Sequence, residues 1–224
     1  MKDGRRSWLR PTLIPALIAL VVIVAAAFYA DQQNTILTTE RMHSAVLDRV
    51  ALIRAKLEGN INGNIQLVRG MVSTLSTEPN MNQERFAALA VNLFGQGSQL
   101  RSIAAAPDLV VRLTYPLQGN SAAIGLDYRT NLAQRDATLR ARDTGRLVLA
   151  GPVNLVQGGR GFIGRFPVYV GSGADRAFWG IISAVVDVDK LYADSGLLDP
   201  DLSIDVSISG RDNGRFFGPD LSAD

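Results

Sequence analysis

The chain has 224 residues, a net charge of +2, 47% hydrophobic residues, no cysteine and one histidine. It is long enough for one folded core with an accessory segment, and too hydrophobic to stay disordered. The lack of cysteine excludes disulfides, thiolate metal sites and cysteine nucleophiles, and the single histidine excludes a multi-histidine zinc site. We therefore expect no metal and no cofactor.

The positive charge is concentrated at the N-terminus. The first ten residues carry a net charge of +3, whereas the remainder carries 19 basic and 20 acidic side chains, a net charge of −1. A protein that binds a phosphate backbone needs a basic surface on its folded part. This distribution excludes nucleic acid as a partner.

Residues 11–30 are an uncharged stretch of twenty residues that predicts a transmembrane helix. At about 1.5 Å per residue such a helix spans roughly 30 Å of hydrocarbon. Trp8 and Tyr29 flank it as interface aromatics, and the positive-inside rule makes residues 1–10 cytoplasmic and the rest of the chain extracytoplasmic. The alternative is a cleaved signal peptide, since Ala25–Ala27 fits a small-residue cleavage site; it exports the same residues.

Residues 31–77 have the periodicity of a long stalk helix. A first stripe steps by alternating threes and fours, as a coiled-coil seam does, and comprises Ile36, Thr39, His43, Val46, Val50, Ile53 and Leu57. Beyond Leu57 a second stripe comprises Ile61, Ile65, Val68, Val72 and Leu75. We expect the membrane-proximal half to pair with a second copy in a homodimer and the distal half to dock on its own domain. The alternative is an amphipathic helix packed on one core, without a dimer.

Residues 78–198 predict an α+β, PAS-like ligand-binding domain built around an antiparallel sheet. Asn82 begins a short helix, and a second helix over residues 131–143 ends at Gly145. The expected strands are residues 109–115, 122–127, 147–155, 162–170 and 178–188, of which the last two form a hairpin.

Residues 199–224 predict the start of a second, smaller, membrane-proximal PAS-like subdomain. Apolar and polar residues alternate over 202–209, and Asn213-Gly214 indicates a type I′ hairpin turn that leads to Phe216-Phe217. Because two strands alone are not stable, we expect this subdomain to be truncated and to continue beyond residue 224.

A set of motifs follows in order between about residues 85 and 190. They are Ser98-Gln99-Leu100-Arg101, Ala106-Pro107, Tyr115-Pro116-Leu117, Gly119-Asn120, Ile124-Gly125-Leu126-Asp127, Ala141-Arg142-Asp143-Thr144-Gly145, Leu149, Gly151-Pro152-Val153, Leu155-Val156-Gln157-Gly158, Gly161-Phe162, Phe166-Pro167-Val168-Tyr169 and Phe178-Trp179-Gly180. Together they resemble the CHASE family of extracytoplasmic sensor domains. The preceding membrane helix and stalk agree with this resemblance.

The resemblance implies a stalk helix bearing two PAS-like subdomains, with a small-molecule ligand in the membrane-distal one. It places the chain in a receptor of the inner membrane, with its bulk periplasmic and a histidine kinase or cyclic-di-GMP enzyme as cytoplasmic output. Asp127 matches an acidic residue with which plant members bind the purine-like ring of cytokinins. Leu149 matches an apolar pocket residue, and Thr144 lies in a segment sensitive to substitution. Gly158-Gly159 departs from the plant pattern and argues against cytokinin itself.

The candidate ligand-binding residues are Asp127, Leu149, Thr144, Arg101, Tyr115, Arg165 and Phe166. Asp127 is either a ligand acceptor or a turn residue. Arg101 and Arg165 could each pair with a ligand carboxylate, but we favour pairing with an internal acid. Tyr115 and Phe166 are more typical of a core than of a pocket wall.

We expect no enzyme in this segment. Gly159, Gly161 and Gly164 spell G-x-G-x-x-G, but a strand pattern follows where a dinucleotide site needs a helix. The alternatives to a sensor are an exported hydrolase that uses paired carboxylates such as Asp127 and Asp143, and a structural envelope protein. Within the sensor class, the alternative is a Cache domain.

Overall fold

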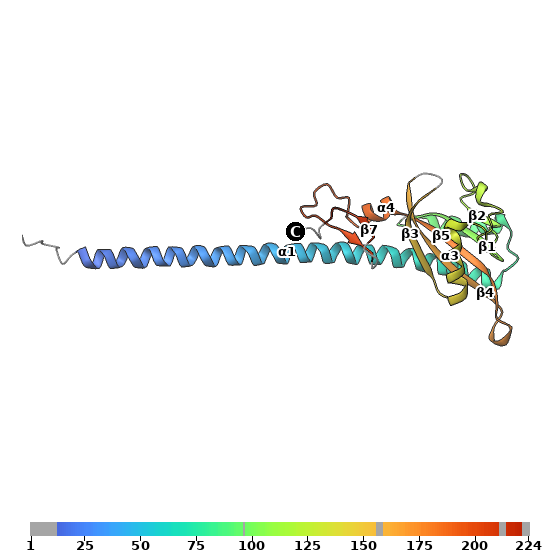
Figure 1. Ribbon diagram of the computed structural model, residues 1–224, viewed down its shortest axis with the longest axis horizontal. Coiled ribbons are helices and arrows are strands. Elements are labelled where there is room, and N and C mark those ends of the chain that lie inside the picture. The colour runs from blue at the N-terminus through green and yellow to red at the C-terminus, as the bar shows by residue number, and fades with distance from the viewer. Residues whose placement is uncertain (1–12, 96, 156–158, 211–213, 221–224) are drawn as a thin grey trace, which may run out of the picture. The chain divides into compact units, whose positions relative to one another are not determined.

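Figure 1 shows the computed structural model, which describes residues 13–95, 97–155, 159–210 and 214–220. The predicted cytoplasmic residues 1–10 and Asn213 of the predicted hairpin turn lie outside these ranges. The chain divides into two compact units, residues 1–51 and 52–224.

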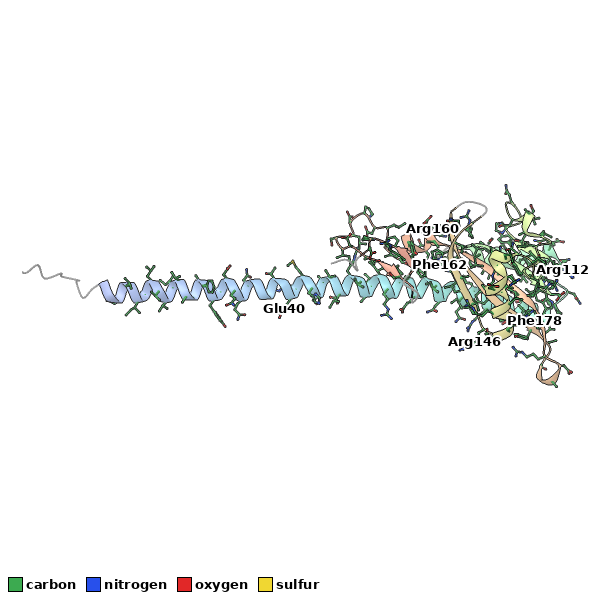
Figure 2. All side chains as sticks on the ribbon, in the orientation of Figure 1. Glu40, Arg112, Arg146, Arg160, Phe162 and Phe178 are labelled. Atoms are coloured by element: carbon green, nitrogen blue, oxygen red, sulfur yellow. The ribbon has the colours of Figure 1, made fainter. Side chains whose placement is uncertain are left out.

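One α-helix, α1 (Leu13–Thr77), contains both the predicted membrane segment and the predicted stalk. Its stretch Leu17–Asn34 is long and apolar enough to cross a membrane. Every described side chain between residues 17 and 52 is exposed, Glu40 in Figure 2 among them. The helix ends at Thr77 as predicted, because Pro79 cannot continue it.

The docking of α1 on its own domain begins earlier than the stripe pattern predicts. Ile53 is only 6% exposed and packs in a cluster with Val188, Tyr192 and Leu197, against which Leu57 also packs. The expectation that these two seam residues face a partner helix is therefore wrong. Their neighbours come from the far end of the chain, so the helical periodicity could not show which surface covers them.

The second unit contains a five-stranded antiparallel sheet in the order β2-β1-β5-β4-β3. The strands are β1 (Leu100–Pro107), β2 (Leu113–Tyr115), β3 (Val148–Asn154), β4 (Arg160–Val170) and β5 (Ala177–Asp187). β5 is the central strand and pairs with β1 on one side and β4 on the other. The α+β class and the β4–β5 hairpin are confirmed.

The predicted helix ends follow from their cap residues. Asn82 begins α2 (Gln83–Ala90), where its side chain accepts a hydrogen bond from the Arg85 backbone N–H at 2.9 Å. Gly145 ends α3 (Leu132–Thr144) in the left-handed conformation, with φ of 64°. The shorter elements are η1 (Val91–Phe94), η2 (Ser121–Ala123), η3 (Gly173–Asp175) and α4 (Val188–Asp194).

Two strand predictions are wrong, at least in part, and one strand, β1, was not predicted. The strand over 109–115 shrinks to β2. The segment 122–127 begins in the short helix η2, and only Asp127 forms an isolated bridge, with Val110. β1 was not expected because its run of alanines has low strand propensity; burial within the sheet overrides that preference.

The alternating segment 202–209 contributes only its last two residues to a strand. The two-residue β6 (Ile208–Ser209) pairs with β7 (Arg215–Phe217). Leu202, Val206 and Ile208 pack on the cluster that contains Ile53 of α1 and Tyr192 of α4. These apolar side chains are thus removed from water by packing against helices, and the segment does not need to form an extended strand.

The sheet buries both faces, each against different helices. On one face α1 and α2 pack through Val68, Met71, Leu75 and Phe86 against Ile103, Phe166 and Ile182 of the strands. On the other face α3 packs on β3, β4 and β5 (Figure 1, yellow helix), with Tyr128 and Val148 in the same cluster. Neighbouring residues of one strand therefore belong to different cores.

Candidate functional site

The face under α3 holds a buried polar cluster centred on Arg165 of β4. Arg165 lies opposite Ser183 of β5, and its Nη1 donates to the Ser183 hydroxyl. Its Nη2 donates to Oε1 of Gln134, in the first turn of α3, at 2.5 Å. The guanidinium carbon lies 4.6 Å from the ring centroid of Tyr128, whose hydroxyl donates to the Ser183 oxygen at 2.9 Å. We call these four residues the Arg165 cluster.

Arg165 is a buried cation without an acidic partner in the part of the chain that the structure describes. It is 2% exposed, its contacts in the cluster are all neutral, and its Nε–H has no hydrogen-bond acceptor. Burial lowers the pKa of the guanidinium, and Tyr128 opposes this in part. Arginine nevertheless stays protonated in proteins, so the charge remains.

The expected internal ion pair holds for one arginine and not for the other. Arg101 of β1 lies 3.6 Å from a carboxylate oxygen of Asp187, and both side chains are about a third exposed. For Arg165 the expectation is wrong, because the side chains that reach its guanidinium are an amide, a hydroxyl and an aromatic ring.

Leu149 and Phe166 line one apolar cavity on the face under α1. The cavity measures about 30 Å³. Its other lining residues are Ile61, Asn64, Ile65, Val68, Leu100, Leu147, Phe162, Gly164, Ala184, Val186 and Leu191. Since one water needs about 10–15 Å³, the cavity in this conformation has room for little more than water.

Asp127, Thr144 and Tyr115 lie apart from this cavity. Both carboxylate oxygens of Asp127 accept hydrogen bonds from Arg129, which lowers the pKa of the carboxyl through the side-chain bonds first and a backbone bond second. The Thr144 hydroxyl donates to the Arg140 carbonyl at 2.6 Å. Tyr115 stacks edge-to-face on Phe94, with ring centroids 5.0 Å apart.

A second polar cluster joins α1 to the start of β1 and to α4. Asn64 donates to Oε1 of Gln99 at 2.6 Å, and its Oδ1 accepts from the Gln99 backbone N–H at 3.2 Å. Gln99 in turn donates to Asp194 at 2.7 Å, and Asn60 donates to Ser195 at 3.1 Å. Asn64 and Gln99 are buried. This cluster is fully hydrogen-bonded, and it ties α1 to the sheet domain.

Carboxylates in the described part of the chain are scattered, and those of the hydrolase alternative pair with arginines. Within the described ranges, three or more histidine, aspartate or glutamate side chains nowhere gather as a metal site would require. Asp127 is held by Arg129, and Asp143 by Arg142 at 2.7 Å, so each acid of the hydrolase alternative is engaged by its own neighbour. Gly161 and Gly164 lie within β4 rather than before a helix, as expected.

The sequence patterns did not single out Tyr128, Gln134 and Ser183. One signal pointed to the site: Arg165 is the only charged residue of the run 161–170, and Ser183 is the only hydroxyl residue of the run 178–186. Burying a lone polar residue in an apolar strand costs free energy unless it is hydrogen-bonded, so two such residues on two strands are expected to bond to each other. Tyr128 and Gln134 come from a turn and a helix, where polar residues carry no such signal.

Two solved structures of ligand-binding proteins are similar to part of this chain. An extracellular ligand-binding receptor from Desulfohalobium retbaense matches with a TM-score of 0.58 and 18% identity over 76% of this chain and 31% of that one. The ligand-binding domain of the Pseudomonas aeruginosa amino acid chemoreceptor PctC, in complex with GABA, matches with a TM-score of 0.48 and 18% identity, over 64% and 60%. The chain therefore spans less than two thirds of either protein chain.

The domain combines a helix packed on an antiparallel sheet with a buried polar cluster around Arg165. The family model of the CHASE domain matches residues 73–215, more than half of the chain. The chain belongs to the CHASE family, whose members are extracellular sensory domains. No curated protein matches it.

Proposed function

We propose that the chain is the small-molecule sensing part of a membrane-anchored receptor. Residues 11–30 would anchor it in the inner membrane, with its bulk periplasmic. Residues 78–198 would form the PAS-like ligand-binding domain, and residues 199–224 would begin a membrane-proximal subdomain. The output, a histidine kinase or a cyclic-di-GMP enzyme, would lie in the cytoplasm beyond residue 224.

The observation that carries this proposal is the position of β5 between the Arg165 cluster and α1. Ser183 belongs to the cluster, whereas its neighbours Ile182 and Ala184 lie in the core that α1 covers. A ligand that moves Ser183 would therefore move the surface on which α1 packs. Packed helices have discrete arrangements, so a ligand that favours one of them shifts the stalk.

The candidate residues take different roles in this proposal. Arg165 binds the ligand, and Asp127 holds the turn that precedes Tyr128. Phe166 and Tyr115 pack in the core under α1, whereas Leu149 is 49% exposed and lines the small cavity there. Arg101 pairs with Asp187. Thr144 stabilises the end of α3. The stalk would form a homodimer through the exposed part of the seam, Val46 and Val50 included.

Membrane topology tests the anchoring. Alkaline phosphatase fused after residue 224 folds only outside the cytoplasm, and we expect it to be active; a fluorescent protein that folds only in the cytoplasm should stay dark at the same position. The opposite result places the domain inside the cell and contradicts the proposal. Sequencing the reading frame beyond codon 224 tests the output: a second apolar segment followed by a kinase or cyclase supports it, and a stop codon removes it.

A further inference from the structure

The Arg165 cluster lacks the one component that a buried guanidinium requires, an anion. We infer that the site receives the carboxylate of a small-molecule ligand, between β4, β5 and the first turn of α3; this inference deepens the sensing function proposed above and rests on it. A buried charge is costly to retain without a partner, and uncompensated charges of this kind concentrate at functional sites.

The free hydrogen-bonding capacity of Arg165 matches a carboxylate. The guanidinium presents five N–H groups in a planar fork, and its Nε–H has no acceptor. A carboxylate accepts from two N–H groups of one arginine edge and neutralises its charge. The neutral acceptors in the cluster, Ser183 and Gln134, satisfy hydrogen bonds without neutralising the charge.

Gln134 occupies the place of a carboxylate oxygen in this conformation. Its Oε1 lies 2.5 Å from Nη2 of Arg165, and the residue is half-buried on the first turn of α3. A long, unbranched side chain at a helix start can rotate away at low cost. The ligand carboxylate would displace this amide and then bridge Nε and Nη2.

A second unsatisfied atom lies at the same end of α3. Oδ1 of Asn131 is buried without a donor, and the side chain does not cap the helix although Asn131 stands at its N-cap position. Asn131 and Gln134 are three residues apart, a spacing that puts side chains on one side of a helix. Two buried polar atoms near the start of α3, Nε of Arg165 and Oδ1 of Asn131, thus have no hydrogen-bond partner among the described residues, and the Asn131 oxygen calls for a donor.

Thermal unfolding of the full 224-residue chain in detergent tests the inference. The probes are acetate and propanoate, each compared with its neutral amide, acetamide or propanamide, at constant ionic strength set with sodium chloride. We expect the carboxylates to raise the melting temperature saturably and the amides to have no effect. In Arg165→Met, the carboxylate concentration for half-maximal effect should rise at least about tenfold.

Three further variants separate this site from general charge effects. Arg101→Met, which removes the other embedded arginine, should leave the half-maximal concentration within about threefold. Arg165→Lys should weaken the effect although it keeps the charge, because an ammonium group cannot bind a carboxylate through a planar fork. Gln134→Ala should preserve or strengthen the effect, because it removes the competing acceptor.

Several outcomes would overturn the inference. They are equal shifts by carboxylates and amides, an effect undiminished in Arg165→Met, an effect lost equally in Arg101→Met, a shift by inorganic phosphate alone, and no shift with any carboxylate. None of these outcomes depends on membrane topology or on the output domain. The fusion and sequencing experiments therefore test the sensing proposal independently of this inference. If Arg165→Met does not fold, the other two variants decide the question: the effect should weaken in Arg165→Lys and should not weaken in Gln134→Ala.

Discussion

Arg165 and Ser183 face each other across strands β4 and β5, and the guanidinium donates to the hydroxyl beneath α3. Phe166, the next residue of β4, points into the core on the other side of the sheet. One strand thus holds a polar cluster on one face and the packing surface for α1 on the other.

The first prediction is that substitutions on the two faces change the free energy of unfolding by different amounts. Arg165→Met should leave the free energy of unfolding within about 1 kcal/mol or increase it, because an apolar side chain replaces a buried charge that lacks an acidic partner. Phe166→Ala should cost about 3–5 kcal/mol, since the side chain is 5% exposed. Denaturant unfolding followed by circular dichroism measures both. A loss in Arg165→Met equal to that in Phe166→Ala would show that the arginine is structural.

The second prediction concerns the polar cluster between α1 and the sheet. Asn64→Ala leaves the Gln99 backbone N–H and its side-chain oxygen without their partners, both buried, and should cost about 1–3 kcal/mol. Asn92→Ala is the matched control: its exposed amide donates only to the Ala88 carbonyl, so the loss should stay below about 0.5 kcal/mol. The same unfolding assay compares them, and equal losses would contradict the role of Asn64.

The third prediction is a pH dependence. Arg129 lowers the pKa of Asp127, and Arg85 lowers that of Glu78, in both cases chiefly through side-chain hydrogen bonds. A carboxyl whose pKa is lower in the folded state stabilises the fold above its ordinary pKa, and this contribution is lost as the pH falls through the lowered value. The melting temperature should therefore decline with acidification below the ordinary carboxyl range.

Two variants test that assignment. Asp127→Asn removes the titrating group and Arg129→Met removes the partner that shifts it, so each should flatten part of the acid decline. The contribution is small because the Arg129 side chain is 45% exposed. An acid decline of unchanged shape in both variants would assign it to other groups.

The fourth prediction tests the stalk dimer and uses the absence of cysteine in the chain. Val46→Cys and Val50→Cys, each the only cysteine present, should form disulfide-linked dimers in membranes, because both lie on the predicted seam and are exposed within the chain. Asp48→Cys lies off the seam and should cross-link far less. Non-reducing gel electrophoresis reads the result, and equal cross-linking at all three positions would contradict the seam.

The sequence alone determined those features that depend on neighbouring residues. The helical periodicity up to Thr77, the caps at Asn82 and Gly145, and the hairpin of β4 and β5 were all predicted, because cap chemistry and periodicity act over a few residues. The ordered CHASE motifs were visible for the same reason.

The tertiary structure decided which side chains meet. β4 and β5 are apolar on both faces, so alternation does not reveal that Arg165 and Phe166 serve different cores. Likewise, Ile53 packs against Val188 and Leu197, more than a hundred residues away. The Arg165 cluster combines two strands, a turn and a helix, and only the packing of these elements shows that no acid among the described residues pairs with its cation.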